Sequence, residues 1–143
     1  MTVMKSRWFI VLLGFFGCWS MATAQDVVLV VNKNVRITAI RDADLRAIFT
    51  GAKTRFADGS RVVPVTLKGG AAHEVFLKNH LGEGPDEFRA QWRKAVFTGQ
   101  GAMPRTFDSE SAVIEYVAAT PGAVGYVSRI SSPDNVKCLP VVK

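Results

Sequence analysis

One stretch of the chain has the features of an anion-binding site. A strand is predicted at 62–67, the pair Gly69-Gly70 follows, and a helix is predicted over 71–81. Free N–H groups in the first turn of a helix and the helix dipole favour an anion there, and glycine lets a ligand approach closely. The candidate anion-binding residues are therefore Lys68, Gly69, Gly70, Ala71, Ala72 and His73. A plainer interpretation stays open, in which the glycines serve only the dihedral angles of a strand-to-helix turn.

The histidines, serines and carboxylates do not predict a catalytic or metal site. His73 and His80 are seven residues apart, which separates them by about 10 Å along a helix axis, too far for one metal ion. His80 shares its helix face with Phe76 and is expected at the edge of the core. No serine has the glycine frame of a nucleophile elbow, and Asp42 and Asp108 lie where helix starts favour acids. We therefore expect no enzyme, no metal and no cofactor.

The first half of the chain predicts the elements that would position this site. Val27–Val31 is a β-branched run, typical of a strand buried on both faces. A short helix is predicted from a cap at Asp42 to Gly51, with three apolar residues on one side, Leu45, Ile48 and Phe49. Pro64 indicates that the strand at 62–67 has an edge position or a bulge, because proline donates no hydrogen bond to the ladder.

The second half predicts two more helices and two more strands. Gly84-Pro85 opens one helix, whose apolar face consists of Phe88, Trp92, Ala95 and Val96. Asp108 or Ser109 caps the other, which carries Val113, Ile114 and Val117. Strands are predicted at 123–127 and 136–139, with Cys138 as a small buried residue in the latter. The alternation of strands and helices indicates one α/β domain, a sandwich with a mixed sheet.

The first 24 residues predict export. Lys5 and Arg7 precede an uncharged run at 8–19, and Ala22-Thr23-Ala24 is the small-x-small pattern that a signal peptidase cleaves. The run is too short for a membrane-spanning helix, which needs about 20 apolar residues. A lipoprotein start at Cys18 is disfavoured by the bulky residues before it. We expect a signal peptide at 1–24 and a mature domain at 25–143.

The positive charge of the chain does not predict a nucleic-acid partner. The sequence has 18 Lys and Arg against 12 Asp and Glu, a formal net charge of +6. These basic residues are scattered, and an exported protein rarely meets nucleic acid. Solubility or attraction of small anions explains the charge better. Hydrophobic residues at 48% and charged residues at 21% argue against a disordered chain or a coiled coil.

Several segments, in order, resemble the phosphate substrate-binding proteins of ABC transporters. The most specific are Leu45-x-x-Ile-Phe-Thr-Gly51 and Tyr116-Val-Ala-Ala-Thr-Pro-Gly-Ala-Val-Gly-Tyr-Val127. The match extends over nearly the whole mature chain through Val30-Val-Asn32, Asp58-Gly59, Val62-x-Pro64-Val65, the Gly-Gly helix start, Trp92 and Phe97-Thr-Gly99. The resemblance implies a single-lobe, periplasmic-binding-protein-like (type II) fold, a three-layer sandwich with a mixed sheet that corresponds to the family's second lobe.

The resemblance also implies an exported, periplasmic, non-catalytic protein that binds inorganic phosphate or a similar small oxyanion. Its implied partners are a membrane transporter of the ABC class or a protein that supplies a second lobe. The family's Gly-Ser-Gly-Thr turn maps onto 69–72, where the hydroxyl donors are missing. The family's second anion-facing turn maps near Phe107-Asp108-Ser109-Glu110, where acids repel phosphate.

These departures predict weak anion binding, or binding only together with a second lobe. Each lost charge-assisted hydrogen bond costs about 1.5–3 kcal/mol. A protonated His73 at the helix start could replace the missing donors below about pH 6.5. The alternative from a different class is a protein-interaction module on the same fold, which would use the former cleft surface to dock a partner and would expose an apolar patch there.

Overall fold

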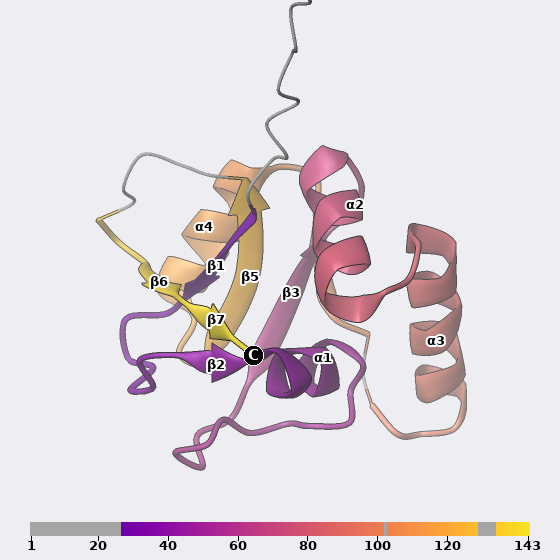
Figure 1. Ribbon diagram of the computed structural model, residues 1–143, viewed down its shortest axis with the longest axis horizontal. Helices are drawn as coiled ribbons and strands as arrows, with labels where there is room; N and C mark the ends of the chain where they lie inside the picture. Colours follow the sequence, from indigo (N-terminus) through magenta and orange to yellow (C-terminus); the bar gives the residue numbers. More distant parts are fainter. Residues whose placement is uncertain (1–26, 102, 129–133) are drawn as a thin grey trace, which may run out of the picture.

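A mixed sheet forms the centre of the molecule (Figure 1), seen in a computed structural model that describes residues 27–101, 103–128 and 134–143. Within these residues, five strands lie in the order β4-β3-β5-β1-β6. Their bounds are Val27–Val31 (β1), Val63–Leu67 (β3), Arg105–Phe107 (β4), Ala123–Ser128 (β5) and Lys137–Leu139 (β6). β3 is parallel to β4 and β5, whereas β1 is antiparallel to β5 and β6. The expected signal peptide at 1–24 lies outside the described residues.

Helices cover both faces of this sheet and make three layers. The helical segments are α1 (Asp42–Phe49), α2 (Ala71–Phe76), the π-helical η1 (Leu77–Leu81), α3 (Pro85–Phe97) and α4 (Glu110–Ala119). Successive residues of β5 show the two faces, because side chains alternate along a strand. Gly125 faces α4, where an added Cβ would lie 2.8 Å from Val113 Cγ1. Tyr126 faces α2, with its ring stacked on Phe76 at 3.9 Å between centroids.

The central strands are buried because their apolar runs are continuous. Val30 and Val31 of β1 are fully buried, as are Ala123, Val124 and Val127 of β5. β1 has the predicted bounds Val27–Val31, which confirms this strand, and its last three residues are buried. The helix predicted over 71–81 is also confirmed, as α2 followed directly by η1, and it ends at Gly82 with φ 69°.

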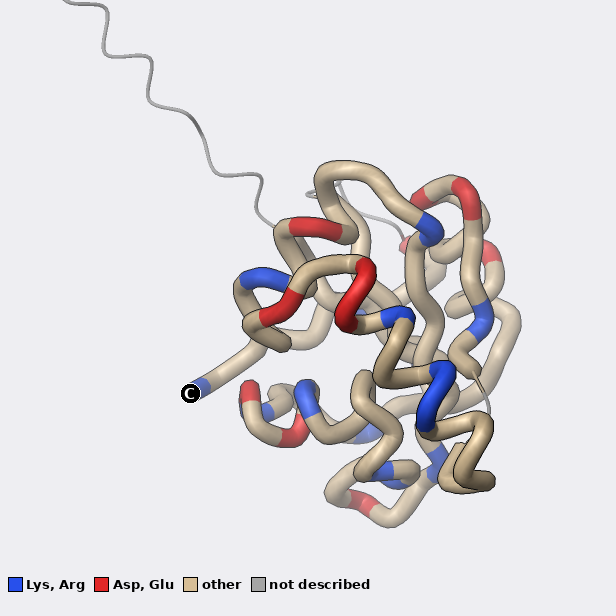
Figure 2. Tube along the Cα trace, turned by 90° about the vertical axis from the view of Figure 1, so that its right-hand side faces the viewer, with Lys and Arg blue, Asp and Glu red and all other residues tan. Residues whose placement is uncertain are grey.

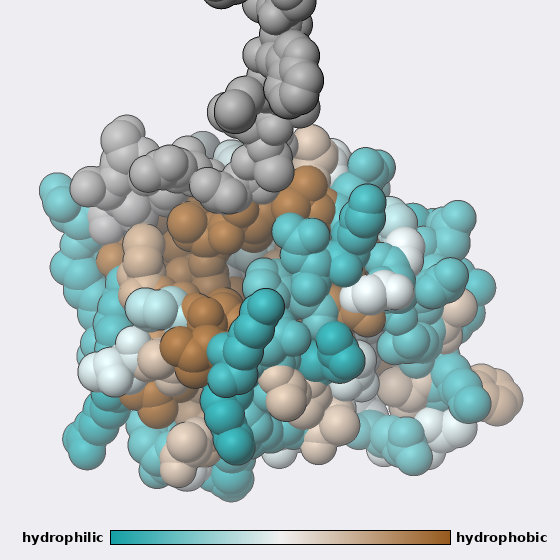
Figure 3. Space-filling model, in the orientation of Figure 1, coloured by the Kyte–Doolittle hydropathy of each residue, from teal (hydrophilic) through white to brown (hydrophobic). Residues whose placement is uncertain are grey.

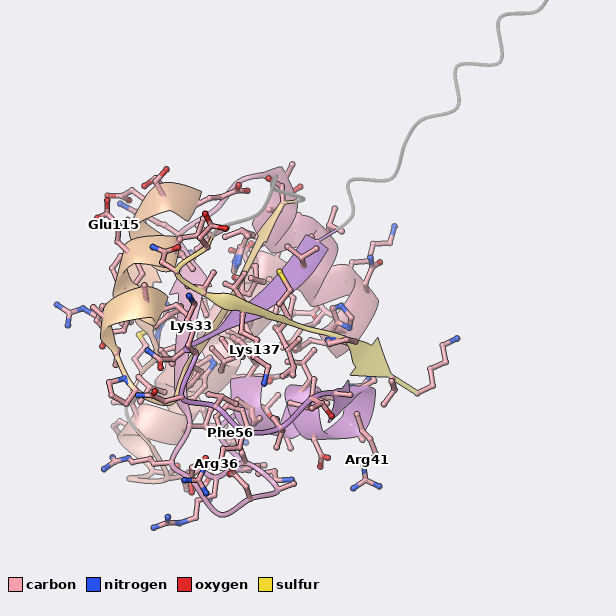
Figure 4. The ribbon with its side chains drawn as sticks, turned by 90° about the vertical axis from the view of Figure 1, so that its left-hand side faces the viewer. Lys33, Arg36, Arg41, Phe56, Glu115 and Lys137 are labelled. Atoms are coloured by element: carbon pink, nitrogen blue, oxygen red, sulfur yellow. The ribbon has the colours of Figure 1, made fainter. Side chains whose placement is uncertain are left out.

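Two polar side chains tie connecting segments to the core. The Asn32 amide donates to the carbonyls of Val117 at 2.8 Å and Ala118 at 3.2 Å, which lie in the last turn of α4. Lys137 Nζ donates to the carbonyls of Val35 at 3.0 Å and Ile37 at 2.6 Å. In Figure 4, Lys137 extends from β6 toward the segment that follows β1. Both contacts satisfy carbonyl groups that have no partner in the sheet.

The strand that contains Pro64 is not at the edge of the sheet, as its proline had predicted, but Pro64 itself lies where no hydrogen bond to β4 is needed. β3 is an interior strand between β4 and β5, not an edge strand. β4, however, pairs only with Val65–Leu67, so Pro64 precedes the first residue that meets β4. Val63 N donates to Gly122 O on the β5 side. By alternation the Pro64 nitrogen faces the other side, where no ladder partner is present.

The sequence predicted the N-cap of α4 correctly and the N-cap of α1 wrongly. Asp42 does not cap α1: Arg41 has the N-cap position, and the carboxylate of Asp42 lies 2.8 Å from His80 Nδ1. Ser109 caps α4 as predicted, since its hydroxyl accepts a hydrogen bond from Ala112 N at 3.2 Å. The contact with Asp42 and a ring contact with Phe76 confirm His80 as a half-buried residue at the core edge.

Two residues that the sequence placed in the core are exposed. Val96 is 46% exposed, because α3 lies at the side of the molecule and only Phe88 and Trp92 of its apolar face are buried (Figure 1). Cys138 is also exposed, because β6 is an edge strand. It lies beside an apolar surface on the face that carries β6 and β7 (Val141–Val142), seen in brown in Figure 3.

Three short strands were not predicted. β4 has three residues, and β2 (Ile40–Arg41) and β7 have two each. β2 and β7 pair in parallel with each other, although about a hundred residues separate them in sequence. Segments this short carry no period-2 pattern, so only the tertiary pairing makes them strands.

Candidate functional site

A cavity of about 330 Å³ lies where β3 ends and α2 begins. We call it the threonine cavity. Its lining comes from the end of β3, from α2, from α3 and from the segment that leads into β4: Thr66, Leu67, Lys68, His73, Pro85, Phe88, Arg89, Trp92, Met103, Pro104 and Thr106. In α/β folds ligands bind outside the carboxyl ends of parallel strands, and β3 and β4 are parallel.

The hydroxyl groups in this cavity come from Thr66 and Thr106, which are register partners on β3 and β4. Their Oγ1 atoms lie 3.3 Å apart, and the Thr106 hydroxyl also reaches the Pro104 carbonyl at 3.4 Å. Thr66 is buried and Thr106 is exposed. Hydroxyl hydrogens rotate freely, so both groups can donate to an anion in the cavity. The cavity therefore contains hydroxyl donors that the Gly-Gly turn lacks.

Sequence reasoning missed these threonines. Alternation along the strand at 62–67 puts Thr66 on the same side as Lys68, which is a usable signal. Thr106 had no such signal, because β4 was not predicted.

The positive charges of the threonine cavity are on Lys68 and Arg89, whose side chains are mostly exposed. Lys68 Nζ lies 3.7 Å from Asp108, and an Arg89 nitrogen lies 3.6 Å from Asp86. Such exposed pairs contribute about 0–1 kcal/mol, so an anion can compete for either cation. Among the described residues, no carboxylate lines the cavity itself.

The acids expected near the second anion-facing turn have separate roles. Asp108 does lie beside Lys68. The Glu110 carboxylate instead accepts hydrogen bonds from Ser128, from its N at 3.0 Å and its hydroxyl at 2.6 Å. The Glu110 carboxylate is therefore bound to Ser128 of β5, and Asp108 is the acid of this turn that lies beside Lys68.

The six predicted anion-binding residues are spread between this cavity, an exposed turn and the core. Lys68 and His73 line the cavity. Gly69, Gly70 and Ala71 are exposed, and Ala72 is buried. Gly70 has φ 96°, which favours glycine, and a Cβ at Gly69 or Gly70 would meet no atom within 4 Å. The backbone conformation therefore accounts for Gly70, and the space beside both glycines is open.

His73 belongs to a buried hydrogen-bond network with Tyr126. The Tyr126 hydroxyl accepts a hydrogen bond from Leu67 N at 3.2 Å and also contacts His73 Nδ1. The hydroxyl hydrogen then goes to Nδ1, which leaves the ring proton of a neutral His73 on Nε2. Burial is the main cause that lowers the pKa of His73, with Arg89 acting in the same direction and Glu74 opposing it. The neutral ring is thus favoured, so a cationic His73 requires a pH lower than the 6.5 expected from the sequence.

A second cavity of about 450 Å³ adjoins the first. We call it the tryptophan cavity. Its lining is Ile48, Gly51, Lys53, Thr54, Arg61, Val62, Val63, Pro64, Trp92, Gln100, Gly101, Met103, Pro104 and Arg105. The two cavities share Trp92, Met103 and Pro104. Trp92 is fixed by a hydrogen bond from Nε1 to the Phe49 carbonyl at 2.9 Å.

Basic residues surround both cavities. Figure 2 views the α3 side of the molecule, where acidic residues lie in the first turn of α3 and basic residues follow along it. Lys53 and Arg61 line the tryptophan cavity, with Lys53 bonded to Asp44 at 2.9 Å. The guanidinium of Arg105 lies 5.3 Å from the centre of the Tyr116 ring. In the described part of the chain, no carboxylate lines the tryptophan cavity either.

No group of three or more His, Cys, Asp or Glu residues in the described part of the chain lies in an arrangement that could hold a metal ion. No described helix is both long enough and apolar enough to cross a membrane.

Three proteins of known structure have folds similar to that of this chain. No family model matches the chain. The chain is similar to a protein from Clostridium perfringens assigned as a phosphate ABC transporter substrate-binding protein, with bound phosphate (18% identity, TM-score 0.63, 80% of this chain and 44% of that one). It is also similar to PstS from Borrelia burgdorferi (17%, 0.60, 80% and 46%). A third similar structure is an ABC-type phosphate transport receptor from Vibrio cholerae (18%, 0.58, 80% and 45%).

These similarities confirm the predicted fold class, a periplasmic-binding-protein-like α/β sandwich with a mixed sheet. At such low identities they show the fold alone. The chain spans less than half the length of each of these three proteins.

Proposed function

We propose that this protein binds phosphate, or another small oxyanion, in the threonine cavity and catalyses no reaction. One observation carries the proposal. The cavity combines two cations, Lys68 and Arg89, with two rotatable hydroxyl groups, and no carboxylate lines it among the described residues. Proteins bind oxyanions by cations and hydroxyl donors of this kind. Similar folds include a phosphate-bound one.

The expected contacts follow from the geometry. Lys68 and Arg89 supply charge, and Thr66 and Thr106 supply hydroxyl donors in place of those missing at 69–72. Hydrogen bonds to a charged group contribute about 1.5–3 kcal/mol each. Because both cations are exposed and each has a nearby carboxylate, we expect affinity well below that of an enclosed two-lobe site.

The first test is calorimetric titration of the purified protein with phosphate and then sulfate at low salt. We expect one site, weakened about tenfold or more in Lys68→Gln and in Arg89→Gln, because each variant removes a charge from the cavity. Arg93→Gln is the matched control, an exposed arginine of α3 outside the cavity lining. Equal affinity in all three variants, or no heat at millimolar phosphate, would overturn the proposal.

We also propose that residues 1–24 are a signal peptide and that the protein acts in the periplasm. The sequence pattern supports this proposal, as does the likeness to phosphate transport receptors. Expression with the native start and mass measurement of the periplasmic product test it. A product that begins at Gln25 is expected, whereas a full-length product retained in the cytoplasm would contradict it.

A more specific form of the proposal is that the protein works together with a phosphate ABC transporter. The support is the naming of similar structures as transport receptors or transporter substrate-binding proteins. The chain spans less than half of their length, and in this form of the proposal a second-lobe protein closes over the cavity. Added inorganic phosphate should then strengthen the complex between the two.

A second candidate function is a protein-interaction module on the same fold. The observation in its favour is an exposed apolar group at the end of α3 and in the segment that follows: Phe97 is 93% exposed, Met103 53% and Val96 46%. Exposed apolar side chains that gather in one place mark interaction sites. The phosphate titration separates the two functions, because this second function requires no anion.

A further inference from the structure

We infer that the anion bound by this protein is an organic phosphate with an apolar body, such as an aryl phosphate monoester, and that the body occupies the tryptophan cavity. This inference rests on the proposed function, because it places the phosphate group in the threonine cavity. It adds a ligand class that the phosphate group alone does not require.

The size and lining of the tryptophan cavity support an organic ligand. Its volume of about 450 Å³ falls in the range of small-molecule sites, roughly 300–1,000 Å³. Apolar side chains make up much of its lining: Ile48, Val62, Val63, Pro64, Trp92 and Met103. A phosphate ion alone would leave this surface uncovered, whereas an apolar body would remove it from water.

The two cavities share a wall in which Trp92 is held in place and Met103 can move. Trp92 is 4% exposed and is held by its hydrogen bond to Phe49. Backbone at Gly51 approaches the indole closely, since an added Cβ would lie 3.2 Å from it, and a Cβ at Gly101 would be in ordinary contact at 3.7 Å. Met103, by contrast, is exposed and unbranched, and can yield to a ligand. A molecule with its phosphate beside the threonines can therefore extend along Trp92 into the second cavity.

The charges of the two cavities favour an anionic ligand, because the tryptophan cavity is lined by Lys53, Arg61 and Arg105 as well as by apolar side chains. The hydroxyl donors lie in the threonine cavity, together with Lys68 and Arg89. Neither cavity is lined by a carboxylate among the described residues, so a cationic or zwitterionic ligand finds no partner there. A phosphate monoester fits this lining, because it is an anion without a cationic group and its phosphate can meet the hydroxyl donors of the threonine cavity.

The test compares inorganic phosphate with phenyl phosphate by calorimetric titration of the purified protein. We expect phenyl phosphate to bind at least tenfold more tightly. Gly101→Leu adds a side chain to the tryptophan cavity at a site where a Cβ makes ordinary contact with Trp92. This variant should lower the affinity for phenyl phosphate to that for inorganic phosphate and leave the latter unchanged. Ala90→Leu, on the exposed side of α3 and outside both linings, is the matched control and should change neither.

The outcomes separate this inference from the proposed function. Equal affinity for the two compounds in the wild type would overturn the inference and leave phosphate binding intact. A preference for phenyl phosphate that survives in Gly101→Leu would also overturn it, because the body would then lie elsewhere. Binding of neither compound would refute the proposed function and the inference together.

Discussion

At the residue scale, the three polar residues that are buried in the described part of the chain each have a partner, whereas one buried carboxylate oxygen, Glu83 Oε1, has none. The three residues are Asn32, Thr66 and His73. Asn32 satisfies carbonyls at the end of α4, Thr66 meets Thr106, and His73 meets the Tyr126 hydroxyl. Burial without a partner costs about 1–3 kcal/mol per group, so these contacts make the burial tolerable. Two of the three residues also line the threonine cavity, which couples the core to the candidate site.

His73 makes stability depend on pH. Burial lowers its pKa in the folded protein below the ordinary value of 6.5. Between the two values the unfolded chain binds more protons, so the free energy of unfolding rises with pH through this window. The stabilisation is complete above about pH 6.5 and is lost as the pH falls toward the folded pKa. We expect urea midpoints in phosphate-free buffer to decrease from pH 7.5 to pH 5.

The His73→Gln variant isolates this contribution. Glutamine keeps an acceptor for Tyr126 and does not titrate, so the decrease in midpoint between pH 7.5 and pH 5 should be smaller than in the wild type. Glu83, whose pKa burial raises, acts in the opposite direction in both proteins. Identical pH profiles for the variant and the wild type would show that His73 does not titrate differently on folding.

At the element scale, helix packing depends on one glycine of the central strand. A Cβ at Gly125 would lie 2.8 Å from Val113 Cγ1 of α4 and 2.8 Å from Val65 Cγ2 of β3. Neither valine has free space, because both are fully buried. The close contact of α4 with the sheet therefore requires a residue without a side chain at this point.

Gly125→Ala should therefore destabilise the protein by about 1–3 kcal/mol through overpacking. Chemical denaturation of the variant measures this change. The double variant Gly125→Ala/Val113→Ala should lose less stability than the sum of the two single variants, since the shortened side chain makes room for the new methyl group. Gly84→Ala, where a Cβ meets nothing within 4 Å, is the control. Additive losses in the double variant would place the strain elsewhere.

At the scale of the whole molecule, the sheet order decides which residues are at an edge. β6 pairs with β1 on one side only, and its Cys138 is exposed. On the opposite edge, β4 and the segment before it form part of the cavity wall with α3. One edge of the sheet thus contributes to the candidate site, and the other carries an accessible thiol.

Cys138 should react with a thiol reagent such as Ellman's reagent in the folded protein. We expect the native rate to be within about tenfold of the rate in denaturant, because reactivity follows exposure. Cys138→Ser should abolish the signal in the chain without residues 1–24, where it is the only cysteine. A native rate a thousandfold slower would mean that another part of the chain or a second copy covers β6.

The sequence by itself determined the elements whose signals are local. Val27–Val31, the run at 123–127, the proline-started α3 and the serine-capped α4 have patterns or caps that nearby residues settle. The glycine-led start of α2 was predictable for the same reason. These elements are enough to predict an α/β sandwich with a mixed sheet.

Only the tertiary structure decided which residues meet at the candidate site. Thr66 and Thr106 are forty residues apart and become neighbours because β3 pairs with β4, a strand too short to have a pattern of its own. The tryptophan cavity and the buried contact between His73 and Tyr126 likewise join distant segments. The strand order and the exposure of Cys138 and Val96 depend on which faces find partners. Local propensity contains no information about pairing across such separations, because burial is a property of the assembled chain.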